Sequence, residues 1–120
     1  MADKDVLGRA GEERAARHFQ ERGFVVLDRN WRAPGGELDL VVASAGHIVV
    51  VEVKTRRTAG FGHPLEAVDA RKRSRLWRLT MAWVAAHPEA VQGRRLRIDA
   101  IGIIGPDPLT GSIEHIENVA

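Results

Sequence analysis

Residues 36–54 read Gly-Glu-Leu-Asp-Leu-Val-Val-Ala-Ser-Ala-Gly-His-Ile-Val-Val-Val-Glu-Val-Lys. Two β-prone runs, 38–43 and 47–54, flank a tight turn at 44–46, which predicts a β-hairpin. The second run is rich in valine on both of its faces, and a strand of that kind is usually central and buried. We therefore expect this hairpin to form the middle of a β-sheet.

The flanking sequence supplies helices and further strands. An alanine- and charge-rich stretch that ends at Gly23 predicts a first helix, and a long amphipathic stretch that ends near Pro88 predicts a second. The resulting order is α-β-β-β-α-β, which indicates a single α/β domain over residues 1–120, with a mixed sheet flanked by helices. The two helices are expected at 8–22 and 65–86, the other strands at 24–27, 95–104 and 113–118, and a loop at 60–64.

Composition excludes several classes of protein. The 120 residues are 44% hydrophobic and 28% charged, as in globular domains, and include no cysteine. Disulfides, thiolate catalysis and cysteine-based zinc sites are therefore excluded. The longest apolar run, 81–86, is far too short to span a bilayer, and no secretory signal is visible, so we expect a cytoplasmic protein without a membrane partner.

Several charged side chains occupy positions where apolar residues belong. On helical wheels, Glu12 and Lys72 fall inside the apolar stripes of the two helices, while Glu13 points away. In the hairpin, a two-residue turn at 45–46 places Asp39 across from Glu52.

The same register places Glu37 across from Lys54, whereas a slip of one residue would turn Asp39 to the other face. Structural ion pairs are one reading of these charges. However, five inward charges exceed what a small core needs. Converging carboxylates beside a lysine are a hard-oxygen site suited to Mg²⁺ or Mn²⁺.

The same residues resemble a known nuclease signature. Asp39 followed by Glu52-Val53-Lys54 on the next strand resembles the P-D-(D/E)-x-K motif, with Leu38 in place of the proline. The chain is also similar, from about residue 8 to residue 104, to the bacterial YraN-like family of uncharacterised, predicted endonucleases. The stretches that carry this similarity are 8–12, 29–32, 36–40, 51–56, Phe61-Gly62, 65–68 and Lys72.

The resemblance implies a restriction-endonuclease-like fold, similar to that of archaeal Holliday-junction resolvases. By position, the metal-ligand roles would fall on Glu12, Asp39 and Glu52, and the catalytic roles on Lys54, Glu52 and Asp39. The implied cofactor is Mg²⁺ or Mn²⁺. The implied activity is structure-selective cleavage of DNA, with branched DNA as one substrate.

Charge is concentrated in the middle of the sequence. Residues 53–78 contain eight basic and two acidic residues, although the whole chain carries only +2. Such a stretch predicts an anion-binding face or, equally, a solvated helix. If DNA binds there, the expected phosphate contacts are Arg56, Arg57, Arg71, Lys72 and Arg73.

Trp77 and Met81 lie on the side of the second helix opposite its core stripe. We expect them to be exposed and to form a contact surface, either for a homodimer or for stacking with a nucleic-acid base. The alternative is that a loop or the C-terminal segment covers Trp77. Two other functions remain open beside the endonuclease. They are a non-catalytic nucleic-acid-binding module on a nuclease fold, and a protein-interaction subunit in which the charge cluster is structural.

Overall fold

The structure is a computed structural model that describes the backbone of residues 3–58 and 69–120 and the side chains of residues 7–58 and 69–120. The loop expected at 60–64, and the motif residues from Phe61 to Val68, lie outside the described residues. Among the described residues, no helix is both long and apolar enough to cross a bilayer.

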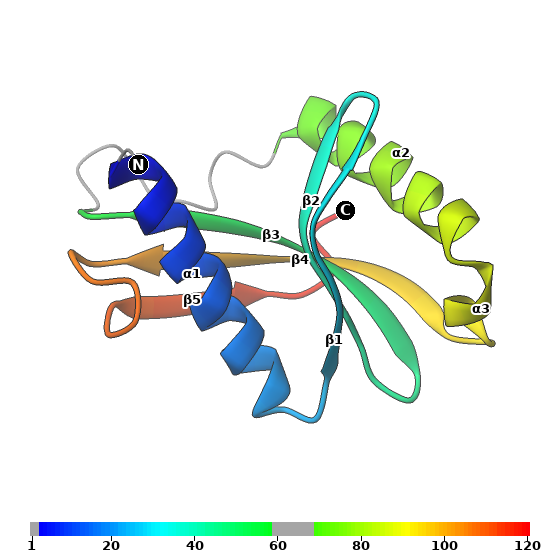
Figure 1. The fold of residues 1–120 in the computed structure, drawn as a ribbon, viewed down its shortest axis with the longest axis horizontal. Helices are drawn as coiled ribbons and strands as arrows, with labels where there is room; N and C mark the ends of the chain where they lie inside the picture. The colour runs from blue at the N-terminus through cyan, green and yellow to red at the C-terminus, as the bar shows by residue number, and fades with distance from the viewer. Residues whose placement is uncertain (1–2, 59–68) are drawn as a thin grey trace.

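A five-stranded mixed sheet forms the centre of the fold (Figure 1). Its strand order is β1-β2-β3-β4-β5, in which β3 and β4 are parallel and the other neighbouring pairs are antiparallel. This confirms the α/β class, the expected order of elements and the central place of β3. The elements are α1 (Asp3–Gln20), β1 (Val25–Ala33), β2 (Gly36–Ala43), β3 (His47–Arg56), α2 (Ala70–Ala86), α3 (Pro88–Val91), β4 (Arg95–Ile104) and β5 (Ser112–Ile116).

The second helix begins later than its amphipathic pattern predicts. Asp69 has an extended backbone, and its side chain accepts a hydrogen bond from the backbone N–H of Lys72 at 2.9 Å. An N-cap of this kind satisfies a donor that the first turn leaves unpaired. The expectation of one uninterrupted helix over residues 65–86 is therefore wrong, because hydrophobic periodicity does not reveal the N-cap at Asp69.

The hairpin register agrees with the two-residue turn. Leu40 pairs with Val51 and Ala43 with Ile48, and the backbone N–H of Ser44 donates to the carbonyl of His47 at 2.9 Å. This register sets which face of the sheet each side chain of β3 occupies.

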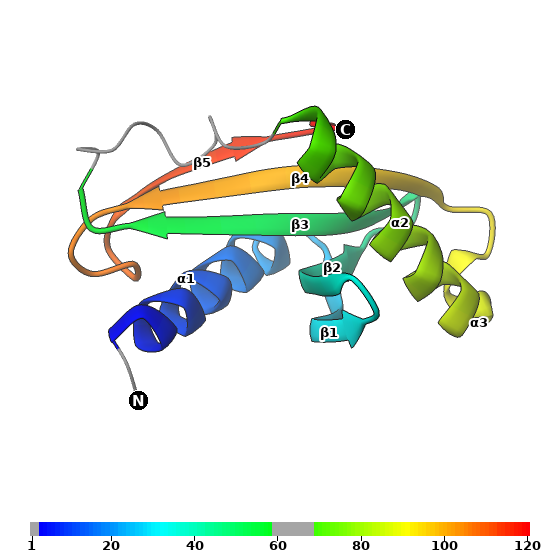
Figure 2. The same ribbon diagram turned by 90° about the horizontal axis from the view of Figure 1, so that it is seen from above.

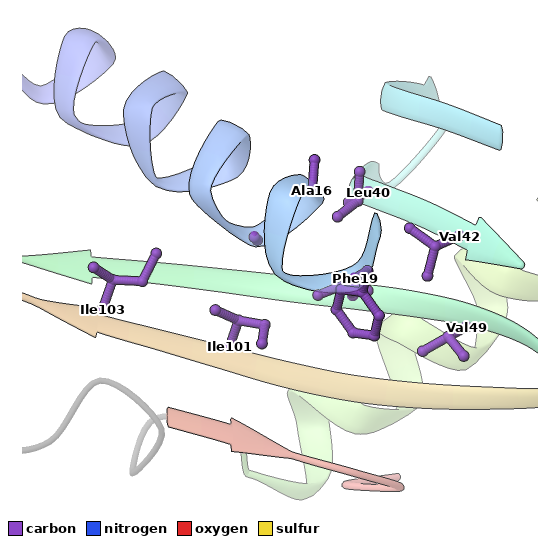
Figure 3. Close-up of a cluster of buried hydrophobic side chains, with 9 residues drawn as sticks. Ala16, Phe19, Leu40, Val42, Val49, Ile101 and Ile103 are labelled. Carbon is purple, nitrogen blue, oxygen red and sulfur yellow. The ribbon is translucent and has the colours of Figure 1, made fainter. Parts of the chain in front are cut away.

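The two long helices pack on opposite faces of the sheet. Figures 1 and 2 show α1 crossing the sheet obliquely near the ends of β3 and β4, and α2 at the other end of the sheet. On the α1 face, Phe19 packs with Val49 and Val51, as Figure 3 illustrates for this cluster. On the α2 face, Trp83 packs with Val50. The side chains of β3 therefore alternate between two separate cores.

Helix α1 approaches β3 closely at Gly11. A Cβ atom at this position would lie 2.6 Å from Cγ2 and 2.9 Å from Oγ1 of Thr55, whereas a Cβ atom at Gly8 would meet nothing within 4 Å. Gly11 is buried and precedes Glu12. The missing side chain therefore allows α1 to bring Glu12 toward the end of β3.

This contact predicts opposite effects for two glycine substitutions in one helix. Gly8→Ala should raise the free energy of unfolding by roughly 0.5–1 kcal/mol, because alanine favours the helix. Gly11→Ala should lower it by about 1 kcal/mol or more, since overpacking against Thr55 outweighs the same helical gain. Urea unfolding of both variants measures the difference. Equal stabilisation by the two alanines would contradict the close approach.

Candidate active site

Asp39 lies where β2 separates from β3. The pairing of the two strands runs from Ala43 with Ile48 to Leu40 with Val51. One step further, Oδ2 of Asp39 accepts a hydrogen bond from the backbone N–H of Val53 at 2.9 Å. The Asp39 side chain thus accepts from a backbone N–H of β3 just beyond the segment where β2 and β3 pair. Asp39 is thereby held against the edge of the central strand.

The surroundings of Asp39 disfavour its negative charge. Burial, together with the carboxylates of Glu52, Glu12 and Glu37, raises its pKa to about 7, against a lowering effect of the Val53 hydrogen bond. Desolvation and like charges both destabilise an ionised carboxylate. A cation bound at this position would relieve both effects.

Glu52 forms ion pairs with two lysines. Its Oε1 lies 2.8 Å from Nζ of Lys72 and 3.7 Å from Nζ of Lys54. The side chains of Glu52 and Lys72 are only 10% and 13% exposed, so this pair is shielded from water. The expected inward direction of Lys72 is confirmed: this lysine, in the first turn of α2, faces the sheet and pairs with Glu52.

The second lysine, Lys54, has a perturbed ammonium group. Burial lowers its pKa, the nearby Lys72 lowers it further, and Glu52 and Asp39 act in the opposite direction. A lysine of lowered pKa exchanges its proton more readily near neutral pH. The arrangement therefore supplies one amine suited to proton transfer beside two carboxylates.

Glu12 reaches the same region from the other face of the sheet. With its amide nitrogen turned toward Glu12, Asn30 of β1 donates to the two carboxylate oxygens at 3.1 and 3.2 Å. This orientation is the one that the hydrogen-bond network supports. Burial raises the pKa of Glu12, while the Asn30 hydrogen bond lowers it. Because Asp39 lies at the separation of β2 and β3, it interacts electrostatically with Glu12 and with Glu52.

Glu37 occupies a different place from the expected one. The register predicts that it lies across from Lys54, but the pairing of β2 with β3 ends at Leu40. Glu37 pairs with Arg32 of β1, and Oε2 of Glu37 lies 3.2 Å from Nε of Arg32. The expectation is wrong because β2 follows β1 past the point where it leaves β3.

The carboxylate oxygens of this site are chemically suited to a divalent cation. Carboxylate oxygens are the ligands that Mg²⁺ and Mn²⁺ prefer, and Asp39 carries unfavourable repulsion that such an ion would neutralise. Within residues 3–58 and 69–120, however, no three acidic or histidine side chains are already grouped as metal ligands. Glu52 is instead engaged by Lys72. A cation bound by Glu52 must therefore compete with this lysine.

The basic residues expected on the anion-binding face divide into two groups. Arg56 and Arg57 are exposed at the end of β3, and Arg71 and Arg73 are exposed in the first turns of α2. The contact of Lys72 with Glu52 joins the first turn of α2 to β3 at a point four residues before Arg56. Lys72 belongs to neither group, because its ammonium group is paired with Glu52 and its side chain is only 13% exposed.

The far side of α2 is partly covered. Trp77 is half-buried against the core on the α2 face, and Val119 and Ala120 pack against the same core. Met81 is 52% exposed. The expected exposure is thus confirmed for Met81 and wrong for Trp77, because Trp77 packs against this core although its wheel position lies opposite the main apolar stripe.

Two groups of polar residues were not singled out by sequence reasoning. Asn30 has a left-handed backbone with φ of 50°, a conformation that asparagine tolerates better than most residues. Asp99 is fully buried and contacts Arg97 and His115. Asp99 stands in the apolar strand 95–104, so the search for inward charges would have found it there.

Comparison with known proteins places this chain among bacterial relatives of its own size. A relative from Acidothermus cellulolyticus, named "UPF0102 protein", is 52% identical over 94% of this chain and 92% of its own length. Relatives with the same name from Clavibacter michiganensis subsp. michiganensis and Paenarthrobacter aurescens are 47% and 43% identical over 98% and 99% of the chain. They are covered over 98% and 97% of their own lengths.

The family described as "Uncharacterised protein family UPF0102" matches residues 11–103. This segment includes Glu12, Asp39, Glu52, Lys54 and Lys72, so the whole candidate active site lies inside the matched region. With a match over most of the chain and relatives more than 40% identical along nearly all of it, the protein is a member of the uncharacterised protein family UPF0102.

Proposed function

We propose that this chain is a divalent-metal-dependent DNA endonuclease of the P-D-(D/E)-x-K superfamily, with a restriction-endonuclease-like fold and a preference for branched DNA. The observation that carries the proposal is the position of Asp39, which is held against β3 beside Glu52 and Lys54. Two carboxylates and a lysine on neighbouring strands match the chemistry of phosphodiester hydrolysis.

In this proposal, Glu12, Asp39 and Glu52 would hold Mg²⁺ or Mn²⁺. Such an ion supplies charge for the phosphodiester oxygens and acidifies a bound water. The chain's own residues provide proton transfer, further charge stabilisation and the positioning of Asp39. Lys54 moves a proton at Nζ and stabilises negative charge near the scissile phosphate, and the hydrogen bond from Val53 holds Asp39 in place.

Lys72 has a separate role in the proposed site. Its ion pair with Oε1 of Glu52 neutralises a carboxylate that would otherwise be buried without a counter-charge. Lys72→Met should therefore lower the melting temperature of the metal-free protein and tighten Mn²⁺ binding by about tenfold, since the competing cation is gone. Calorimetric titration with Mn²⁺ measures the affinity. Unchanged affinity in the variant would show that Lys72 and the metal do not compete.

Arg71 and Arg73 are the proposed phosphate contacts on α2. Each contact that neutralises a DNA phosphate contributes about 0.9 to the slope of log K against log salt. Arg71→Ala with Arg73→Ala should therefore flatten that slope by between one and two, measured by fluorescence anisotropy with a DNA duplex. Arg95→Ala, at an exposed position at the start of β4, is the control. An unaltered slope in the double variant would place the DNA elsewhere.

Cleavage assays with Mg²⁺ or Mn²⁺ test the proposal directly. Branched, flapped, linear duplex and single-stranded DNA are compared, with EDTA as the control. The expected result is metal-dependent incision of branched DNA. Salt-sensitive DNA binding without incision under every metal condition would favour the second candidate, a non-catalytic nucleic-acid-binding module, which the exposed arginines of α2 also support.

A homodimer through the α2 surface remains a proposal that rests mainly on Met81. Trp77→Glu is less informative for this purpose, since Trp77 also packs against the core on the α2 face. Met81→Glu should shift a dimer to a folded monomer in analytical ultracentrifugation. A wild-type chain that is monomeric at tens of micromolar, with and without DNA, would exclude the dimer.

A further inference from the structure

A second polar region lies between the later half of α1 and the segment that joins β4 to β5. A cavity of about 370 Å³ is present there, which is within the size range of ligand sites. None of the proposed active-site residues lines it. Its lining residues are Arg14, Arg17, His18, Glu21, Arg22, Leu109 and Ile113.

The lining carries an excess of positive charge that is largely prearranged. Nη1 of Arg14 donates to the carbonyls of Pro108 and Gly111 at 3.0 and 3.1 Å, and Nη1 of Arg22 donates to the carbonyl of His18 at 2.8 Å. These contacts hold two guanidinium groups in place before any ligand arrives, which reduces the entropy cost of binding. Glu21 is the one acidic residue among the lining residues.

The third guanidinium group is available for a ligand. Arg17 is exposed, and its side chain has no hydrogen bond or ion pair with any residue that the structure describes. Guanidinium groups bind carboxylate and phosphate oxygens through paired N–H donors. Three of them around one cavity favour a ligand with several anionic oxygens.

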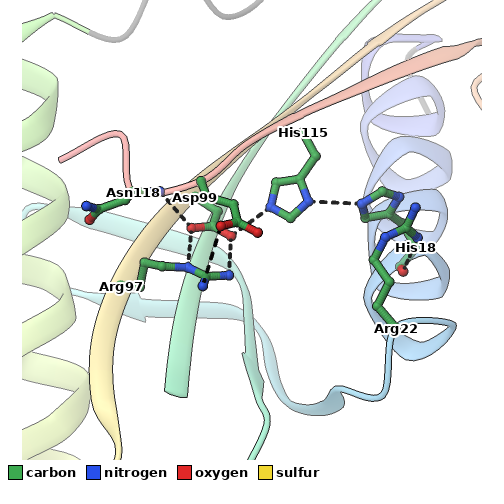
Figure 4. A network of polar contacts seen from close by, with 7 residues as sticks. His18, Arg22, Arg97, Asp99, His115 and Asn118 are labelled. Carbon is green, nitrogen blue, oxygen red and sulfur yellow. Dashed lines mark hydrogen bonds and ion pairs between the residues drawn. The ribbon is translucent and has the colours of Figure 1, made fainter. Parts of the chain in front are cut away.

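His18 connects the cavity to a buried carboxylate, as Figure 4 shows. Asp99 is fully buried and receives Nε and Nη2 of Arg97 at 2.8 and 2.9 Å. Its Oδ2 also lies 2.7 Å from Nε2 of His115, and Nδ1 of His115 lies 3.0 Å from Nε2 of His18. Because Asp99 accepts from His115, a neutral His115 presents Nδ1 as an acceptor, and His18 donates to it.

The surroundings of His18 carry an excess of positive charge that a bound anion would neutralise. Burial, together with Arg22, His115 and Arg14, lowers its pKa to about 4, while Glu21 acts in the opposite direction. At neutral pH the imidazole is therefore uncharged, although a buried carboxylate stands at the other end of the chain of hydrogen bonds. An anion in the cavity would offset the field of the arginines.

We propose that this cavity binds an oxyanion of the phosphate class, held by Arg14, Arg17 and Arg22, with His18 in its wall as the residue that senses the charge of the ligand. The proposal does not depend on the nuclease activity, because it uses none of Glu12, Asp39, Glu52 or Lys54. The phosphate group can come from a nucleic-acid backbone or from a free phosphorylated compound, and the cavity chemistry is the same for both.

The test is a titration of the full chain, at constant pH, with inorganic phosphate, pyrophosphate and a short single-stranded DNA. Imidazole resonances of His18 and His115 are followed by NMR, and affinities are measured by calorimetry. We expect pyrophosphate to shift the His18 resonances at constant pH. Separate pH titrations with and without pyrophosphate should show a higher pKa of His18 when the anion is bound. Arg17→Gln with Arg22→Gln should weaken pyrophosphate binding at least tenfold. Arg95→Gln, which removes an exposed charge outside the cavity, should leave it unchanged.

The origin of the phosphate follows from competition between the ligands. If the single strand shifts His18 and displaces pyrophosphate, the cavity binds a backbone phosphate; if only the small anions do so, it binds a free phosphorylated compound. Pyrophosphate that leaves the His18 resonances unmoved would overturn the proposal. Equal weakening by Arg95→Gln and by the double variant would overturn it as well, since binding would then reflect net charge alone.

Discussion

Asp39→Asn should make the metal-free protein more stable at pH 8 and remove its response to Mn²⁺. The pKa of Asp39 is raised from an ordinary value of 3.8 to about 7 by burial and by neighbouring carboxylates. Between these pH values the folded state keeps a proton that the unfolded chain has lost, so stability falls as the pH rises through this window. Above pH 7 the full cost of the charged carboxylate is present.

Asparagine removes that charge and can still accept the hydrogen bond from Val53. In EDTA at pH 8 we expect the variant to gain on the order of 2 kcal/mol, with a smaller gain at pH 5. With Mn²⁺, the melting temperature of the wild type should rise, and that of the variant should stay constant.

Glu37→Gln is the matched control, since Glu37 is paired with Arg32 and its side chain is 38% exposed. It should change stability by less than about 0.5 kcal/mol and keep the Mn²⁺ response. A destabilised Asp39→Asn variant at pH 8, or one that responds to Mn²⁺ like the wild type, would remove Asp39 from the proposed metal site.

Lys54→Ala should abolish DNA cleavage and leave DNA binding nearly intact. Its ammonium group lies 3.7 Å from Oε1 of Glu52, and burial and Lys72 lower its pKa. In the proposed mechanism it acts on charge and protons that develop in the transition state, so its loss should reduce the cleavage rate by about 10³-fold. The dissociation constant for branched DNA should change by less than about threefold.

Two companion variants test whether the effect is specific to Lys54. Lys54→Arg keeps the positive charge but does not release its proton, so it should fold and bind DNA like the wild type without restoring the cleavage rate. Arg56→Ala, two residues further along β3 at an exposed position, should weaken DNA binding and retain turnover. A Lys54→Ala protein that cleaves at the wild-type rate would show that these residues do not form the catalytic site.

Local sequence was sufficient to predict the mixed sheet and the proximity of Asp39 and Glu52 at its centre. Residues 48–51 of the valine-rich strand 47–54 are buried on both faces of the sheet, because hydrophobic side chains at each of these positions leave no polar face for water. The two-residue turn set the register, and the strict alternation of a strand then placed Asp39 near Glu52. The wheel of α2 identified Lys72 as an inward cation, since a helix repeats its face every three to four residues.

Other features depend on contacts between segments that are distant in the chain. The bond between Asp39 and Val53, the pair of Glu37 with Arg32 and the half-burial of Trp77 each follow from how strands and helices meet. Strand and helix periodicities specify the face of an element but not where two elements part, as β2 does from β3.

The chain of contacts from Asp99 to His18 joins three separate elements, β4, β5 and α1. No spacing within one element encodes it, and burial of one carboxylate required the other elements to supply its partners. Residue patterns thus identified which charges face inward, because burial follows periodicity. Only the packed structure specified which partners those charges meet, because the hydrogen bonds and ion pairs of a buried group are formed by whichever elements close over it.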